Sequence, residues 1–272
     1  MKSDIDVVEL SRFIRKKCLV LGHSVGRKGA HFGGGLSAVE ILSTLYASIM
    51  DYDFQNPFRE DRDRLIISKG HCVLPYYSLL HHFGLLSDLQ YSEFETDGGY
   101  LHGHATRNLG DGIEFSGGSL SMGMPYAVGV AIGLKKKSIS NKVYCVIGDG
   151  ECDEGLIWEA AMSASNFKLD NFVLIVDCNK VQYDGFTVDV MDKLSLADKF
   201  TSFGFSAIQC DGHDVNDLAA SLVKSDVDKP LVVIAHTIKG KGVSFMEQVP
   251  GWHHNYLSDE MLEIAMREQD VR

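Results

Sequence analysis

An aspartate and an asparagine about thirty positions apart could together hold a metal ion. Asp149 lies in the turn Gly148-Asp149-Gly150, and Asn179 follows the apolar run Phe172 to Val176. One carboxylate and one amide oxygen form the sparse ligand set that Mg²⁺ accepts when phosphate oxygens and water complete its octahedron. The flanking glycines carry no Cβ, so the backbone can approach a phosphate closely. The pattern predicts a site for a metal-bound diphosphate; the alternative is a tight turn and an asparagine that ends a strand.

Two strands and a helix are needed to bring these residues together. Val143 to Ile147 is a short apolar, β-branched run, and Gly155 to Asn166 carries apolar residues at helical spacing. With the run Phe172 to Val176, the order is strand, glycine turn, helix, strand, which is typical of a βαβ unit with parallel strands. Open parallel sheets bind ligands beyond the carboxyl ends of their strands, so both residues are expected in one crevice. The N-terminus of the helix adds free N–H groups for an anion.

Further strands and helices of the same kind accompany this unit. Leu65 to Ser68 is typical of a buried strand and precedes a helix from Val73 to Phe83. Phe205 to Gln209, a helix from Asp214 to Lys224 and a strand from Leu231 to His236 form another βαβ unit. The predicted fold class is therefore α/β, a parallel β-sheet with helices on both faces.

Helices are also expected outside these units. Apolar periodicity predicts amphipathic helices over Ile5 to Leu21 and Ser258 to Arg272, and small residues favour a closely packed helix over Met124 to Leu134. Another helix should begin near Ser37, because Ser37 and Glu40 have the spacing of a capping box.

Composition fits one large α/β domain with a substantial core. The chain has 272 residues, of which 45% are hydrophobic. We expect a single domain spanning residues 1–272, with two smaller domains as the alternative. The net charge of -11 argues against nucleic acid or an anionic membrane as a partner. An anionic cofactor would then need local attraction from a metal ion and helix N-termini.

Cysteine usage and hydropathy favour a cytoplasmic location. The six cysteines lie far apart, without a CxxC pair or zinc-like spacing, which is typical of free thiols in a reducing compartment. The N-terminal segment lacks the apolar core of a signal peptide, and no apolar stretch approaches about 18 residues. We expect a protein that is neither secreted by the usual route nor membrane-spanning.

The GDG turn followed by Asn179-Lys180 resembles the thiamine diphosphate fingerprint, and the surrounding residues resemble transketolases. The resemblance extends from about residue 8 to 257. It implies thiamine diphosphate with Mg²⁺ (or Ca²⁺ or Mn²⁺), the metal being held by Asp149, Asn179 and the backbone oxygen of Val181. It also implies transfer of a two-carbon ketol unit, through a carbanion on the cofactor, from a ketose (phosphate) donor to an aldose acceptor.

The resemblance assigns further roles residue by residue. The residues implied to hold the cofactor are His71, Gly118, Ser119, Leu120, Gly150, Asn179, Lys239 and His253. The residues implied to contact substrate or move protons are His31, His104, Glu154 and His253. Glu154 resembles a buried glutamate that links two active sites across a dimer, and a first-turn acid that interacts with the helix dipole is its alternative. Glu151 and Asp153 fit that alternative better.

Some positions depart from the family pattern. Phe32 and Ala105 stand where prolines are usual, His254 stands where glycine commonly follows the histidine, and the stretch Gly22 to Gly29 has no recognised equivalent. These departures leave the loop shape and the choice of substrate open. Of the two histidines at 102 and 104, His104 is favoured to face the site.

The resemblance covers only the diphosphate-binding part of a transketolase. No residue matches the glutamate that activates the aminopyrimidine of the cofactor. We therefore expect the N-terminal subunit of a split transketolase, inactive alone and assembled as α₂β₂ with a separately encoded partner that carries the pyrimidine-binding domain. The alternatives are the α-subunit of a thiamine-dependent 2-oxo acid dehydrogenase or decarboxylase, and a non-catalytic binding homologue. The histidines at 31, 71, 104 and 253 favour a polyhydroxylated sugar over a 2-oxo acid.

Overall fold

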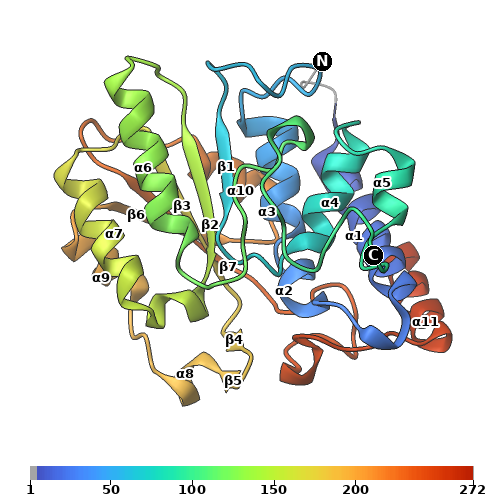
Figure 1. Ribbon diagram of the computed structural model, residues 1–272. Coiled ribbons are helices and arrows are strands. Elements are labelled where there is room, and N and C mark those ends of the chain that lie inside the picture. Colours follow the sequence, from blue (N-terminus) through green and yellow to red (C-terminus); the bar gives the residue numbers. More distant parts are fainter. Residues whose placement is uncertain (1–4, 272) are drawn as a thin grey trace.

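A five-stranded parallel sheet forms the centre of the protein (Figure 1). The computed structural model describes residues 5–271. Every pair of neighbouring strands in this sheet is parallel, and the spatial order is β1-β2-β3-β7-β6. The strands are β1 (Arg64–Ile67), β2 (Val143–Gly148), β3 (Phe172–Cys178), β6 (Ser206–Asp211) and β7 (Leu231–His236). The predicted α/β class is confirmed, and each predicted strand is present with small shifts at its ends.

Helices cover both faces of the sheet, and each face has its own apolar core (Figure 1). One face is covered by α6 (Gly123–Lys136), α7 (Gly155–Asn166) and α9 (Leu196–Ser202). The other is covered by α1 (Val7–Ser24), α2 (Phe32–Leu36), α3 (Val39–Thr44), α4 (Val73–His82) and α10 (Val215–Leu222). Within β2, Val143, Cys145 and Ile147 enter the first core, whereas Tyr144 and Val146 enter the second. This two-residue alternation explains why the strand is apolar throughout.

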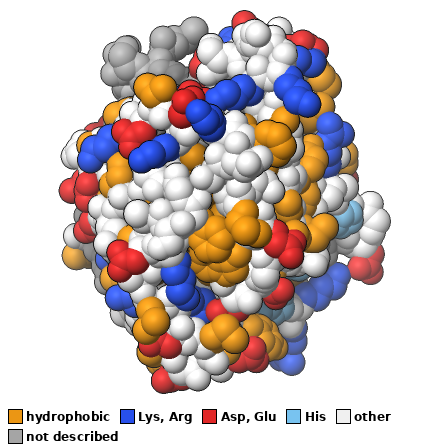
Figure 2. All heavy atoms as spheres, turned by 90° about the vertical axis from the view of Figure 1, so that its left-hand side faces the viewer, with side chains coloured by type: hydrophobic (Ala, Val, Ile, Leu, Met, Phe, Trp, Pro, Cys, Tyr) orange, Lys and Arg blue, Asp and Glu red, His pale blue; other side chains and the backbone are white. Residues whose placement is uncertain are grey.

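Shorter elements complete the chain. They are α5 (Asp88–Ser92), α8 (Thr187–Val190), the antiparallel hairpin β4 (Val181–Gln182) and β5 (Gly185–Phe186), and the one- to two-turn segments Gly26–Lys28, Leu45–Ile49, Leu109–Asp111, Asp149–Asp153 and Pro250–Trp252. The last helix, α11 (Asp259–Val271), packs on α1. Arg272, the expected end of that helix, lies outside the described residues. The outer face over α6, α7 and α9 carries apolar side chains between charged ones (Figure 2).

The predicted capping box at Ser37 and Glu40 is wrong. Ser37 is the C-cap of α2. The N-cap of α3 is Ala38, and no described side chain caps it. The Ser37 hydroxyl instead donates to Asp177 Oδ2 at 2.7 Å, and Glu40 pairs with Arg15. Both side chains bond to buried partners far away in sequence, and these bonds form in place of the local cap.

The register of β2 and β3 places the predicted ligands at one edge. Gly148 pairs with Asp177, so Asp149 and Asn179 both lie just beyond the carboxyl ends of neighbouring parallel strands. The residues that follow β1 and β7, among them Lys69 and Lys239, emerge at the same edge. The predicted crevice is confirmed.

The described residues also bear on the expectations for membrane-spanning helices and for cysteines. No helix within residues 5–271 is long and apolar enough to cross a bilayer. All six cysteines fall within the described range and are free thiols, as expected.

Candidate active site

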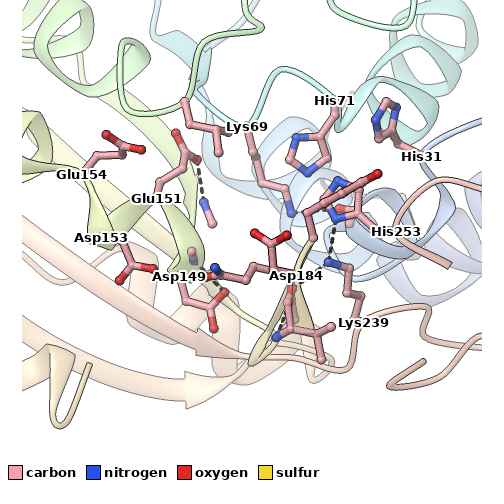
Figure 3. A pocket seen from close by; sticks show the side chains of 18 of the residues that line it. His31, Lys69, His71, Asp149, Glu151, Asp153, Glu154, Asp184, Lys239 and His253 are labelled. Atoms are coloured by element: carbon pink, nitrogen blue, oxygen red, sulfur yellow. Dashed lines mark hydrogen bonds between the residues drawn. The ribbon is translucent and has the colours of Figure 1, made fainter. Parts of the chain in front are cut away.

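A pocket of about 390 Å³ opens at the carboxyl edge of the sheet (Figure 3). Its lining brings together almost every site residue implied by the sequence: His31, His71, His104, Gly118, Leu120, Asp149, Gly150, Glu154, Asn179, Val181, Lys239 and His253. Ser119 lies exposed outside this lining. His104 lines the pocket, whereas His102 borders a different cavity, in agreement with the preference for His104.

The GDG turn directs a buried carboxylate into the pocket. Asp149 Oδ1 accepts a hydrogen bond from the Gly150 amide at 3.0 Å, and Oδ2 accepts one from the Lys180 amide at 2.8 Å. The residue is only 3% exposed. Burial, followed by the charge of Asp177, raises the pKa of Asp149 to about 6. A carboxylate whose charge is this poorly compensated is suited to a nearby cation.

The other two implied metal ligands lie in the segment after β3. Asn179 Oδ1 accepts a hydrogen bond from the Val181 amide at 3.2 Å, and the Val181 carbonyl accepts one from Lys239 Nζ at 2.7 Å. A carbonyl oxygen has two lone pairs, so the bond from Lys239 leaves one of them for a cation. One carboxylate, one amide and one carbonyl are oxygen donors that suit a hard divalent cation, so the residues fit such an ion. The described residues hold no group of three His, Cys, Asp or Glu side chains placed to bind a metal, a pattern that this donor set does not require.

A buried ion pair lies beneath the pocket, and sequence reasoning missed it. Lys69 Nζ donates to Asp177 Oδ2 and, at 2.9 Å, to the Gly34 carbonyl. Asp177 also accepts hydrogen bonds from Ser37 and Thr237. Burial alone would lower the pKa of Lys69 and raise that of Asp177, but each charge stabilises the other and both groups stay ionised. The only signal in the sequence was a polar residue at each strand end.

Glu151 lies in the first turn of the short helix Asp149–Asp153 and bonds the amide of its N-cap, Gly148, in agreement with the interpretation as a first-turn acid. Its side chain accepts hydrogen bonds from Ser68 Oγ at 2.6 Å and from the amides of Ser121 and Gly148, both at 2.8 Å. It is 2% exposed and ties β1, β2 and the 117–123 loop together. Glu151 and Glu154 both line the pocket, but Glu154 is exposed within this chain.

Glycines allow the loop from Gly117 to pack directly against the turn that carries His71. A Cβ on Gly70 would lie 2.5 Å from the Gly118 amide, and a Cβ on Gly117 would lie 2.6 Å from the Gly70 Cα. Gly118 has φ = +139°, a region that L side chains rarely adopt. This close backbone contact brings Gly118 and Leu120 into the pocket wall.

Four histidines line the pocket, and a fifth, His254, packs against one of them, His31. The ring centre of His31 lies 5.4 Å from His71, 5.5 Å from both His104 and His253, and 4.5 Å from His254. Burial and then His254 lower the pKa of His31 to about 3, and burial and then Lys239 lower that of His253 to about 3. These two rings are therefore neutral at physiological pH and can each donate and accept hydrogen bonds.

The hairpin of β4 and β5 adds lining residues that no pattern in the sequence indicated. Gln182, Tyr183 and Asp184 border the pocket, and the Tyr183 ring packs edge-on against His253 at 5.3 Å. The buried Gln182 Oε1 has no hydrogen-bond partner among the described residues.

Acid should destabilise the protein through the partly buried His31. The unfolded chain takes up a proton on His31 near pH 6.5, whereas the folded chain does so only near pH 3. The free energy of unfolding should therefore fall as the pH decreases from about 6.5 toward 3. We expect His31→Asn to reduce this slope by less than about 1.4 kcal/mol per pH unit, measured by urea unfolding at several pH values. An unchanged slope would contradict a neutral His31.

Comparison with known proteins identifies the family. Residues 14–269 match the family described as transketolase, thiamine diphosphate binding domain. The chain belongs to the transketolase family. Its fold is that of part of a transketolase, and thiamine diphosphate is the ligand for which the matched domain is named.

Transketolase subunits of similar length are among the relatives. The chain is 38% identical to an apulose-4-phosphate transketolase subunit of Actinobacillus succinogenes, over 95% of this chain and 94% of that protein. It is 36% identical to the 6-deoxy-6-sulfo-D-fructose transketolase subunit SqwG of a Clostridium species, over 98% of this chain and 97% of that protein. The solved transketolase of Leishmania mexicana superimposes with a TM-score of 0.90 at 25% identity, over 98% of this chain. The chain spans only 41% of that transketolase.

Because these similarities are to transketolases, they do not favour the alternative that the chain is the α-subunit of a 2-oxo acid dehydrogenase or decarboxylase.

Proposed function

We propose that this chain is the diphosphate-binding subunit of a two-chain transketolase, which transfers a two-carbon ketol unit from a ketose to an aldose. The observation that carries the proposal is the position of the four implied histidines around a pocket whose floor holds Asp149 and Asn179. Relatives of nearly the same length that are named transketolase subunits support it. Residues 1–272 then form a single diphosphate-binding domain.

Asp149, Asn179 and the Val181 carbonyl would hold a divalent cation, Mg²⁺ in first place and Ca²⁺ or Mn²⁺ as substitutes. Around the diphosphate, Gly150 would allow close backbone approach, and Lys239 and His71 would contribute a charge and a hydrogen bond. Gly118, Ser119 and Leu120 would border the cofactor, Ser119 through its backbone. When bound, thiamine diphosphate supplies a nucleophilic carbon and an electron sink.

The chain's own histidines would recognise the sugar and move protons. His31 and His253 are neutral, so each ring can donate to one hydroxyl and accept from another. His104 would complete this set from the opposite loop. A neutral imidazole can also accept a proton from a substrate hydroxyl and return it, which is general acid–base catalysis. This environment suits several hydroxyl groups better than the carboxylate of a 2-oxo acid.

A separately encoded chain would complete the site by supplying the pyrimidine-binding domain. Glu154 is exposed at the pocket, in agreement with the role implied for it, contact across a subunit boundary. Apolar side chains nearby are also exposed, such as Leu120 at 40% and Tyr183 at 72%. An α₂β₂ heterotetramer in the cytoplasm is the assembly that we propose.

The test is ketol transfer by the chain alone and after co-expression with the neighbouring reading frame. We expect no transfer by the chain alone and thiamine diphosphate-dependent transfer by the complex. Transfer by the chain alone would overturn the two-chain assembly, and an inactive complex across the ketose panel would count against the proposed function. The panel should contain pentose phosphates together with apulose 4-phosphate and 6-deoxy-6-sulfo-D-fructose, because the relatives carry the latter names.

A further inference from the structure

The loop after β7 delivers a buried lysine to the pocket. Lys239 is 2% exposed; its Nζ donates to the Val181 carbonyl at 2.7 Å and lies 3.0 Å from His253 Nδ1. The position of the ammonium depends on the backbone around Lys239. The Gly240 amide donates to the Gly33 carbonyl at 3.0 Å, the Lys239 carbonyl accepts from the Gln248 amide at 2.9 Å, and side chains bond to Ile238 and Lys241. Ile238 and Lys241 therefore matter for their main-chain contacts.

Three side chains joined by hydrogen bonds, His213, Glu40 and Arg15, bind those two backbone positions. We call these three residues the relay. The Ile238 amide donates to His213 Nε2 at 2.8 Å, and His213 Nδ1 lies 3.0 Å from Glu40 Oε2. Arg15 Nη2 donates to Glu40 Oε1, and Arg15 Nε donates to the Lys241 carbonyl at 3.0 Å. The relay thus leaves the loop at Ile238 and returns to it at Lys241.

The hydrogen bonds determine which ring nitrogen of His213 carries the proton. A backbone amide can only donate, so Nε2 carries no proton and Nδ1 carries the one that is given to Glu40. Burial alone would raise the pKa of Glu40, but Arg15 and His213 hold it below its usual value, so the carboxylate stays ionised. Each of the three side chains therefore has one orientation that satisfies its neighbours.

The relay lies outside the pocket and is built into the fold. Arg15, Glu40 and His213 line a separate cavity that shares none of the lining residues of the candidate active site. Gly242 has φ = +91°, and a Cβ on it would lie 2.5 Å from Arg15 Cδ. Glycine at this position lets the arginine cross the loop and reach the Lys241 carbonyl.

We propose that His213, Glu40 and Arg15 are positioning residues that hold the Ile238–Lys241 loop so that Lys239 is presented to the anionic part of the cofactor. This inference rests on the proposed function of the pocket. None of the three contacts the ligand; they act through the loop backbone. Loss of the Ile238 contact should weaken cofactor binding without removing any group that touches the cofactor.

Two substitutions of His213 test the contacts of its two ring nitrogens separately. In His213→Gln, the side-chain oxygen lies as far from the backbone as Nε2 does, so it can still accept from the backbone amide of Ile238. In His213→Asn, the shorter side chain ends where Nδ1 does, so it keeps the bond to Glu40 and does not reach Ile238. The measurements on the co-expressed complex are the Kd for thiamine diphosphate with Mg²⁺ by calorimetry, hydrogen exchange across residues 237–243, and the unfolding temperature.

We expect His213→Asn to raise the Kd about tenfold and to speed exchange of the Ile238 amide, while His213→Gln stays near wild type. The two variants should unfold at similar temperatures. Equal Kd values for both variants, or faster exchange without a change in Kd, would overturn the positioning role. Lys239→Met is the control for the pocket itself. If this control leaves the Kd unchanged, the cofactor site fails; if it weakens binding but His213→Asn does not, only the positioning role fails.

Discussion

Asp149→Ala is expected to abolish metal-dependent binding of thiamine diphosphate and to lower ketol transfer by at least about a thousandfold. The carboxylate is the only charged member of the proposed ligand set and is buried at 3% exposure. Its pKa, raised to about 6 by burial and then by Asp177, indicates that the folded apoprotein disfavours its charge. A divalent cation relieves that cost, so metal affinity and cofactor affinity should be lost together.

The measurement is a calorimetric titration of thiamine diphosphate at several Mg²⁺ concentrations. Asp149→Asn is a gentler second variant, because an amide of the same shape keeps an acceptor for one of the two backbone amides that Asp149 binds. It should unfold at a temperature close to that of the wild type and still lose the Mg²⁺ dependence. Asp189→Ala, at an exposed position on α8, is the matched control. Unchanged Mg²⁺ dependence in Asp149→Asn would show that another group holds the metal.

The sequence was sufficient to predict the edge of the sheet that carries the site. Parallel strands direct their carboxyl ends to the same side, so Asp149 and Asn179 could be placed together from strand order alone. The family resemblance added histidines from distant loops, which no spacing rule could have brought within 5.5 Å of His31. Strand periodicity and motif resemblance thus supplied different parts of the same pocket.

Errors arose where a local pattern competed with a buried partner elsewhere in the chain. Ser37 and Glu40 have the spacing of a capping box, yet the hydroxyl donates to Asp177, 140 residues away, and the carboxylate pairs with Arg15. Glu151 lies in the first turn of Asp149–Asp153, as the sequence suggested, but that position did not indicate its bonds from Ser68 and Ser121. A polar side chain that is removed from water takes the best available hydrogen-bond partner, and only the tertiary structure shows where that partner is.

Lys69→Met is expected to lower the free energy of unfolding by about 3–5 kcal/mol, because it leaves the carboxylate of Asp177 buried without a counter-charge. Lys69 is 2% exposed and Asp177 is fully buried. The exposed pair of Lys168 and Asp228, 3.1 Å apart, provides the control, since Lys168→Met should leave the stability nearly unchanged. Urea unfolding at neutral pH measures both.

The double variant Lys69→Met/Asp177→Asn separates the ion pair from simple packing. If the cost of Lys69→Met comes from an isolated charge, removing that charge should recover part of the stability, and the two substitutions should cost less together than their sum. Full recovery is not expected, because Ser37 and Thr237 also donate to Asp177 and an amide can accept from only part of this set. Additive costs would mean that Lys69 stabilises the floor of the pocket through its contacts and not through its charge. The pair would then be a packing feature, and the electrostatic explanation of the ionised Asp177 would have to be abandoned.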